Sequence, residues 1–384
     1  MQTNDIERSE SNKEDKRELR RQRRIKSQRK AYITMVFVLV ALVAVIAGGI
    51  WFVGSQIELK MQQETDTEFI QTEEVLDETV QNNEEENIDN KVEEQIEYTD
   101  AMVLDEVVEA IISEMTLEEK VAGLFVVTPE SITGVTKAVQ AGEGTKKALE
   151  QYPVGGLIYS KQNIQSEEQI KMMVQNSKMF SKYPLFFVAD ENVGDSAQLA
   201  SYGFNLNLSS IENLAVGNGI SICAKDFPCA DTSSYEKQNG LPVVNKSLEE
   251  LKQMEMVPFI SAIENEVDMI MVGHMALPQV VGDNTSATMA KEVITDLLRM
   301  ELGFNGVVIT DAMNISAITE YYGADEVAIR AFKAGADMVL MPENFETAYK
   351  GVIAAVQEGT ISEERIDDSL KRVFRIKYAD SVGE

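Results

Sequence analysis

Polar side chains that could act on a substrate follow several apolar runs of the sequence. Asp190 follows LFFVA, Lys225 and Asp226 follow ISICA, and Asp311 follows GVVIT. The only histidine of the chain, His274, ends the run MIMVGH. Two carboxylates that face one cleft suit hydrolysis of a glycosidic bond, because one can attack the sugar while the other protonates the leaving oxygen. Chemistry on a saccharide is therefore a function that residues of these types can serve.

These side chains need a framework that brings the ends of separate strands together. Eight short apolar runs, which begin at residues 124, 156, 185, 205, 220, 269, 306 and 338, are typical of strands buried on both faces. Amphipathic helices lie between most of them, and Thr116, Ser166 and Ser247 are their expected N-caps. Eight strand–helix units predict an α/β fold, a TIM-type (β/α)8 barrel with functional residues at the carboxyl ends of its strands.

Two connections of this barrel are unusually short. About 15 residues separate the third run from the fourth, and about ten separate the fourth from the fifth. A parallel crossover needs at least ~10–12 residues and usually contains a helix. The sequence therefore predicts a barrel in which two βα units are shortened.

The N-terminal part predicts a membrane anchor. The first 30 residues hold 11 Lys and Arg against 6 Asp and Glu, whereas residues 32–53 contain no charged side chain. A helix of 22 residues is about 33 Å long, enough to cross a hydrocarbon core of ~30 Å. The positive-inside rule keeps residues 1–31 in the cytoplasm and predicts a single-pass protein of the cell membrane with its barrel outside. A cleaved signal peptide is the alternative, but the apolar stretch is long for one.

The remaining chain is strongly acidic. Residues 61–100 hold 15 Asp and Glu and a single Lys, so residues 54–100 are expected to form a disordered linker before a barrel domain at 101–384. The net charge of −29 argues against nucleic acid as a partner, which needs clustered Lys and Arg. Cys223 and Cys229 are expected to be buried free thiols, and no spacing fits a structural zinc site.

Several motifs of the barrel region resemble glycoside hydrolase family 3, in particular its β-N-acetylhexosaminidase branch. They include AKDFPC, DMIMVGHMALP, LLRMELGFNGVVITDAMNISAI and AIRAFKAGADMVLMPENF, and the resemblance covers roughly residues 110–378. It implies retaining hydrolysis of O-glycosyl bonds through a covalent glycosyl-enzyme intermediate. The implied substrate is a carbohydrate with terminal N-acetylglucosamine, such as peptidoglycan fragments, and the family requires no metal or organic cofactor.

The resemblance also implies roles for individual residues. Asp311 matches the nucleophile of the family, and Asp190 matches an aspartate that accepts hydrogen bonds from the sugar. Lys225 matches the lysine of a Lys-His pair that contacts the sugar, and Asp226 stands at the position of that histidine. His274 matches a histidine of the strand before the nucleophile strand. As a lone histidine it is equally well interpreted as a satisfied core residue.

The sequence departs from the family at the acid/base. The family uses an Asp-x-His dyad on the loop after Lys225, and counting forward places this dyad on Glu236 and Gln238. A glutamine amide cannot donate and recover a proton, so Glu236 is the expected donor, with Asp226 and Asp231 as lesser candidates. The alternative function is a catalytically impaired pseudoenzyme that binds wall glycan or acts as an envelope scaffold.

Overall fold

The computed structural model describes residues 99–190, 193, 196–210 and 220–379, apart from the side chains of residues 196, 209 and 210. The chain divides into two compact units, residues 1–92 and 93–384. The expected basic segment 1–31, the membrane span 32–53 and the linker up to residue 98 lie outside the described residues. Within the described ranges, no helix is both long and apolar enough to cross a membrane.

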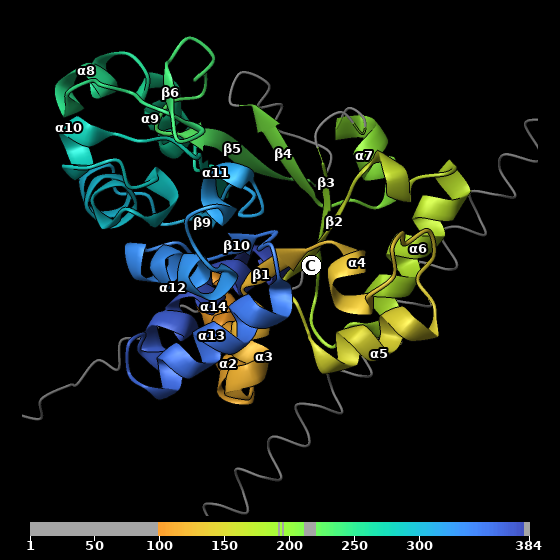
Figure 1. Ribbon diagram of the computed structural model, residues 1–384. Helices are drawn as coiled ribbons and strands as arrows, with labels where there is room; N and C mark the ends of the chain where they lie inside the picture. Colours follow the sequence, from red (N-terminus) through yellow and green to blue (C-terminus); the bar gives the residue numbers. More distant parts are fainter. Residues whose placement is uncertain (1–98, 191–192, 194–195, 211–219, 380–384) are drawn as a thin grey trace, which may run out of the picture. The chain divides into compact units, whose positions relative to one another are not determined.

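Eight parallel strands form the barrel (Figure 1). They are β1 (Phe125–Val127), β2 (Gly156–Tyr159), β3 (Phe186–Ala189), β4 (Leu206–Ser210), β5 (Ser221–Phe227), β8 (Met269–Val272), β9 (Val307–Thr310) and β10 (Val339–Leu340). Around the sheet the order is β10-β1-β2-β3-β4-β5-β8-β9, and a parallel bridge between Ile309 and Met338 joins its two ends. The predicted barrel is confirmed, with one strand in each of the eight apolar runs.

Helices follow most of the strands and cover the barrel. They are α2 (Asp100–Ser113), α3 (Leu117–Ala122), α4 (Pro129–Thr133), α5 (Glu143–Gln151), α6 (Glu167–Phe180), α7 (Ser196–Tyr202), α8 (Leu248–Gln253), α9 (Val257–Glu264), α10 (Pro278–Val281), α11 (Ser316–Thr319), α12 (Ala324–Ala334), α13 (Phe345–Gln357) and α14 (Glu363–Tyr378). Two 3-10 turns, η1 (Lys161–Asn163) and η3 (Ala287–Met289), and a π-helix, η4 (Glu292–Glu301), complete the set. The three expected N-caps are confirmed, because Thr116, Ser166 and Ser247 each accept a hydrogen bond from a backbone N–H of the first turn.

Among the described residues between β3 and β4, the one helix is the seven-residue α7, in agreement with one of the two predicted short units. The second short connection falls at residues 211–219, which lie outside the described residues. Strands β1, β2, β3, β8 and β9 are buried along their whole length, because their apolar side chains pack both inside the barrel and against the helices. Cys223 and Cys229 are buried free thiols, as predicted.

The seam between β9 and β10 is held by a buried aspartate. The backbone N–H of Asp337 donates to the carbonyl of Val308 over 2.7 Å, and the N–H of Val308 donates to Oδ2 of Asp337 over 2.9 Å. Three guanidinium groups and a hydroxyl surround the same carboxylate. They belong to Arg299, Arg365, Arg372 and Ser369. The side chain of Asp337 is fully buried, so these cations supply the charge that its burial requires.

Helix α14 lies across the amino end of the barrel. Nζ of Lys377 donates to the carbonyl of Gly155, directly before β2, over 2.7 Å. Arg365 donates to the carbonyl of Ala336, near the start of β10. Helix α2 packs against α14 and forms ion pairs with its outer side. The amino end of the barrel is therefore closed by helices, which leaves the carboxyl end for a site.

Candidate active site

The predicted site residues meet at one rim of the barrel. Asp190 directly follows β3, Lys225 lies near the end of β5, His274 comes two residues after β8, and Asp311 directly follows β9. All of these strands run parallel, so their carboxyl ends share one edge. This is the edge at which parallel barrels place reactive side chains.

Asp311 is fixed by its neighbours on both sides. Its backbone N–H donates to the carbonyl of Val272 on β8 over 2.9 Å, and Oδ1 accepts from the N–H of Ala312 over 2.7 Å. Two residues on, Met313 donates from its N–H to the carbonyl of Leu340 on β10. The turn after β9 is thus bonded to both adjacent strands, and it holds a partly exposed carboxylate at the rim.

Asp226 is the least expected member of the rim. Its Oδ1 is buried and has no hydrogen-bond partner among the described residues. Burial, followed by the negative charge of Asp311, raises the pKa of Asp226 to about 6, against the opposing effect of Lys225. The two aspartates are therefore close enough to interact electrostatically.

His274 is buried, and protein atoms engage both of its ring nitrogens. Nε2 lies 3.0 Å from the carbonyl oxygen of Ala312 and must donate to it, so Nδ1 of the neutral ring accepts from the hydroxyl of Thr288 at 3.1 Å or of Ser286 at 3.3 Å. Burial lowers the pKa of the imidazole, which keeps the ring neutral. This geometry favours the interpretation of His274 as a satisfied core residue, one that braces the turn after Asp311.

Glu236 lies on the loop between β5 and a small hairpin, β6 (Lys237–Gln238) and β7 (Leu241–Pro242). Its side chain is exposed, and the amide oxygen of Gln238 accepts a hydrogen bond from Asn284. A Cβ on Gly240, at the hairpin turn, would come within 2.9 Å of Cβ of Ala317 on α11. The hairpin therefore contacts the helix that follows Asp311, and Glu236 stays on its solvent side.

Asp190 and Lys225 both interact with other residues of the chain. The N–H of Asp190 donates to the carbonyl of Tyr159 over 2.8 Å, which ties the end of β3 to β2. Their predicted roles in sugar binding stay predictions.

A pH-dependent effect on stability follows from the environment of Asp226. Its pKa in the folded protein, about 6, lies above the ordinary value of 3.8. The folded state thus holds this proton more tightly, and that contribution is complete below about pH 4 and lost as the pH rises through 6. We expect Asp226→Asn to raise the free energy of unfolding by up to about 3 kcal/mol at pH 8 and by little at pH 4. Thermal unfolding at both pH values checks this, and an equal change at both would contradict it.

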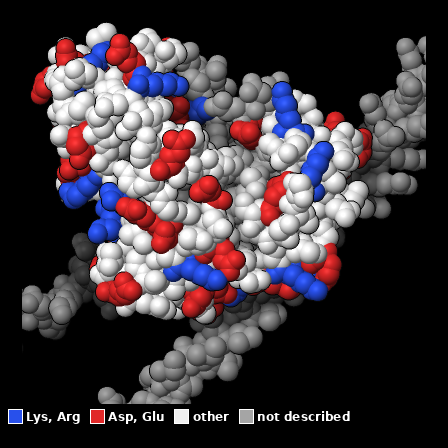
Figure 2. Space-filling model, in the orientation of Figure 1, with Lys and Arg blue, Asp and Glu red and all other residues white. Residues whose placement is uncertain are grey.

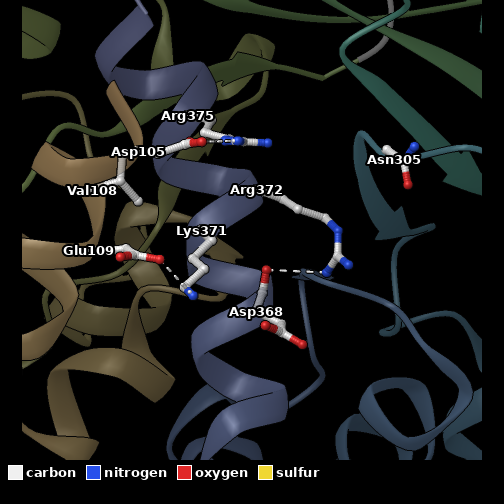
Figure 3. A pocket seen from close by; sticks show the side chains of 8 residues that line it. All are labelled: Asp105, Val108, Glu109, Asn305, Asp368, Lys371, Arg372 and Arg375. Carbon is white, nitrogen blue, oxygen red and sulfur yellow. Dashed lines mark hydrogen bonds and ion pairs between the residues drawn. The ribbon is translucent and has the colours of Figure 1, made fainter. Parts of the chain in front are cut away.

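A hollow of about 450 Å³ lies between α2 and α14, at the end of the domain opposite the rim (Figure 3). Arg375 pairs with Asp105, and Lys371 lies 3.1 Å from Glu109. Three acidic and three basic side chains line the hollow, so their charges balance: Asp105, Glu109, Asp368, Lys371, Arg372 and Arg375. On the face seen in Figure 2, acidic and basic side chains are likewise interspersed. The hollow between α2 and α14 is thus an ion-paired helix junction.

Comparisons with known proteins agree with the barrel fold. Residues 201–376 match the family model described as "Glycosyl hydrolase family 3 N terminal domain". The chain is 28% identical over 181 residues to beta-hexosaminidase A of Pseudoalteromonas piscicida, which covers 41% of this chain and 30% of that protein. It is 31% identical over 169 residues to a beta-N-acetylglucosaminidase/beta-glucosidase of Cellulomonas fimi, with the same two shares. The chain therefore spans less than a third of the length of these two relatives.

Solved structures extend the likeness to most of the barrel. The glycoside hydrolase family 3 beta-N-acetylglucosaminidase of Paenibacillus sp. str. FPU-7 superposes with a TM-score of 0.62 at 26% identity, over 70% of this chain and 64% of that one. Beta-N-acetylhexosaminidase of Beutenbergia cavernae matches with a TM-score of 0.58 at 20% identity, over 69% of this chain and 99% of the other. At that identity the second match shows a shared fold.

Proposed function

We propose that this chain, which carries a divergent glycoside hydrolase family 3 domain, hydrolyses O-glycosyl bonds of terminal β-linked N-acetylglucosamine. The observation that carries the proposal is the position of Asp311 at the carboxyl rim, on a turn whose backbone bonds to both neighbouring strands and whose Ala312 N–H donates to the carboxylate. The names of the relatives support the choice of sugar. The proposal extends to the retaining mechanism, with Asp311 as nucleophile.

The chemistry assigned to the rim is a double displacement. An ionised, rigidly held carboxylate attacks the anomeric carbon and forms a covalent glycosyl ester, which water then hydrolyses. Asp190 and Lys225 are proposed to bind the hydroxyl groups of the sugar, one as acceptor and one as donor.

The proposed location is the outer side of the cell membrane, where wall glycan would be the source of substrate. The uncharged stretch at residues 32–53 and the basic residues before it support an uncleaved anchor. Protease added to intact cells should degrade the barrel domain, whereas a domain degraded only after lysis would contradict this orientation.

The test of activity is release of the aryl alcohol from an activated aryl β-N-acetylglucosaminide by the full chain purified in detergent. Release must exceed that of a heat-treated sample and must depend on Asp311. Failure of the untreated chain to release the alcohol would overturn the proposed hydrolysis.

A second candidate function is sugar binding without turnover. The exposed side chain of Glu236 and the amide of Gln238 at the dyad position favour it. This function predicts saturable binding of N-acetylglucosamine-containing fragments that weakens in Asp190→Ala, together with no hydrolysis of the activated substrate. Isothermal titration calorimetry with these fragments measures the binding, and a titration without a saturable heat signal would exclude this second function.

A further inference from the structure

We infer that Asp226, rather than Glu236, donates and recovers the proton in this active site. The inference rests on the proposed hydrolysis and assigns its missing acid/base. It starts from the strands that carry the two carboxyl groups. Asp226 lies on β5 and Asp311 follows β9, and these strands flank β8 on either side.

A glycine directly after the intervening strand makes room for Asp226. A Cβ on Gly273 would come within 2.6 Å of Cβ of Asp226 and 3.4 Å of its Cγ, so the aspartate occupies the space that a side chain would fill. The N–H of Gly273 bonds to the carbonyl of Phe227, and the N–H of Asp311 bonds to the carbonyl of Val272. Both aspartates are thus held next to the end of β8. Retaining glycosidases need such a pair about 5–5.5 Å apart.

Oδ1 of Asp226 is buried and has no hydrogen-bond partner among the described residues. A buried oxygen that no donor reaches favours the protonated, uncharged carboxyl group. The residue as a whole is only partly buried, so we expect a protonated carboxyl group at this position to donate to the glycosidic oxygen of a bound substrate.

The charges around Asp226 favour a protonated carboxyl group in the first step of the reaction and an ionised one in the second. Burial and the carboxylate of Asp311 raise the pKa of Asp226 to about 6, while Lys225 opposes them. Cys223, the other titratable group near it on β5, has a pKa raised by its own burial, and burial keeps His274, two residues after β8, neutral. Once Asp311 has become an ester its negative charge is gone, so the pKa of Asp226 falls. The acid of the first step then becomes the base of the second.

The proton balance closes without any other group. In the first step the carboxylate of Asp311 bonds to the anomeric carbon, the bond from that carbon to the leaving oxygen breaks, and the proton of Asp226 passes to this oxygen. In the second step Asp226 takes a proton from water, whose oxygen bonds to the anomeric carbon and displaces Asp311. Glu236 has no comparable placement, because its carboxyl group is exposed on the hairpin loop.

The experiment compares two leaving groups in the full chain. For Asp226→Asn we expect kcat/KM toward an alkyl N-acetylglucosaminide to fall by about 10²–10⁴-fold, because this leaving group needs a proton. Toward the 2,4-dinitrophenyl glycoside, whose leaving group needs none, kcat/KM should fall by less than about 10-fold. Azide, a nucleophile that needs no base, should raise kcat of the variant and yield the β-glycosyl azide. Glu236→Gln is measured in parallel, and Asp296→Asn, an exposed carboxylate on η4, is the matched control.

Each result has a distinct meaning. If Asp226→Asn lowered kcat/KM equally toward both substrates and raised KM, Asp226 would bind sugar. This result would overturn the inference about the proton donor but not the proposed hydrolysis. If Glu236→Gln instead lost activity mainly toward the alkyl glycoside and was rescued by azide, Glu236 would be the proton donor and the inference would be overturned. An untreated chain inactive toward the dinitrophenyl glycoside would overturn the proposed function as well.

The unaltered chain offers a measurement that does not depend on a folded variant. Its kcat/KM toward the alkyl substrate should decline above about pH 6, as Asp226 loses its proton. Toward the dinitrophenyl glycoside this decline should be absent. The same decline for both substrates would contradict a proton donor at this position.

Discussion

Asp311→Asn is expected to lower kcat/KM toward the activated aryl N-acetylglucosaminide by at least about 10³-fold, since deletion of an enzyme's nucleophile can cost up to about 10⁶-fold. The amide is nearly the same size as the carboxylate, and its oxygen can still accept from the N–H of Ala312. The fall in kcat/KM would therefore result from loss of the nucleophile and not from displacement of the turn after β9. Good leaving groups do not mask it, because the covalent step still requires the carboxylate.

Two controls make this measurement decisive. Asp311→Ala excludes residual activity that deamidation of an asparagine would create. Asp296→Asn removes an exposed carboxylate on η4, which pairs with Lys291. Activity of the Asp311 variants within about 10-fold of the unaltered chain would remove Asp311 as the nucleophile.

Asp337→Asn is expected to lower the free energy of unfolding by about 3–5 kcal/mol, the cost of removing one partner from a buried ion pair. Arg299 and Arg365 would keep their positive charges inside the domain, where burial already lowers the pKa of both. The variant would also weaken the bond between Val308 and the side chain at the β9–β10 seam. Chemical denaturation followed by circular dichroism measures the change.

The matched control for Asp337 is Glu326→Gln, which weakens an exposed pair with Arg330 one helical turn away. Such pairs contribute about 0.3–0.5 kcal/mol, so this variant should unfold almost as the unaltered chain does. A difference between the two variants of less than about 1 kcal/mol would show that the buried cluster contributes little net stability.

The strands of this barrel could be predicted because each is a compact apolar run, buried on both faces and flanked by capped helices. Thr116, Ser166 and Ser247 show how local the cap signal is, since each bonds within its own first turn. The seam could not be predicted in this way. Asp337 meets arginines that lie about 30 to 40 residues away along the chain, and no periodic pattern links such positions.

The residues of the site also differ in how far the local sequence predicts their positions. Asp311 and Asp190 could be placed because a residue after an apolar strand must lie at the rim. The sequence does not reveal the burial of the Asp226 carboxyl group, because a charged residue at the end of a strand is ordinarily exposed. Its burial depends on Gly273, a neighbour across the sheet, and the glycine in MIMVGH was the available signal. For His274 the sequence leaves both a sugar contact and a core role open, and the hydroxyl groups of Thr288 and Ser286 next to its ring favour the core role.

The described domain begins at Thr99 and passes at once into α2, which packs on α14 at the closed end of the barrel. The chain therefore enters this domain at the end of the barrel opposite the rim that bears Asp311. Ion pairs of Asp105 and Glu109 with α14 fasten the entry, so a substitution in this helix pair should change stability while the geometry of the rim stays as it is.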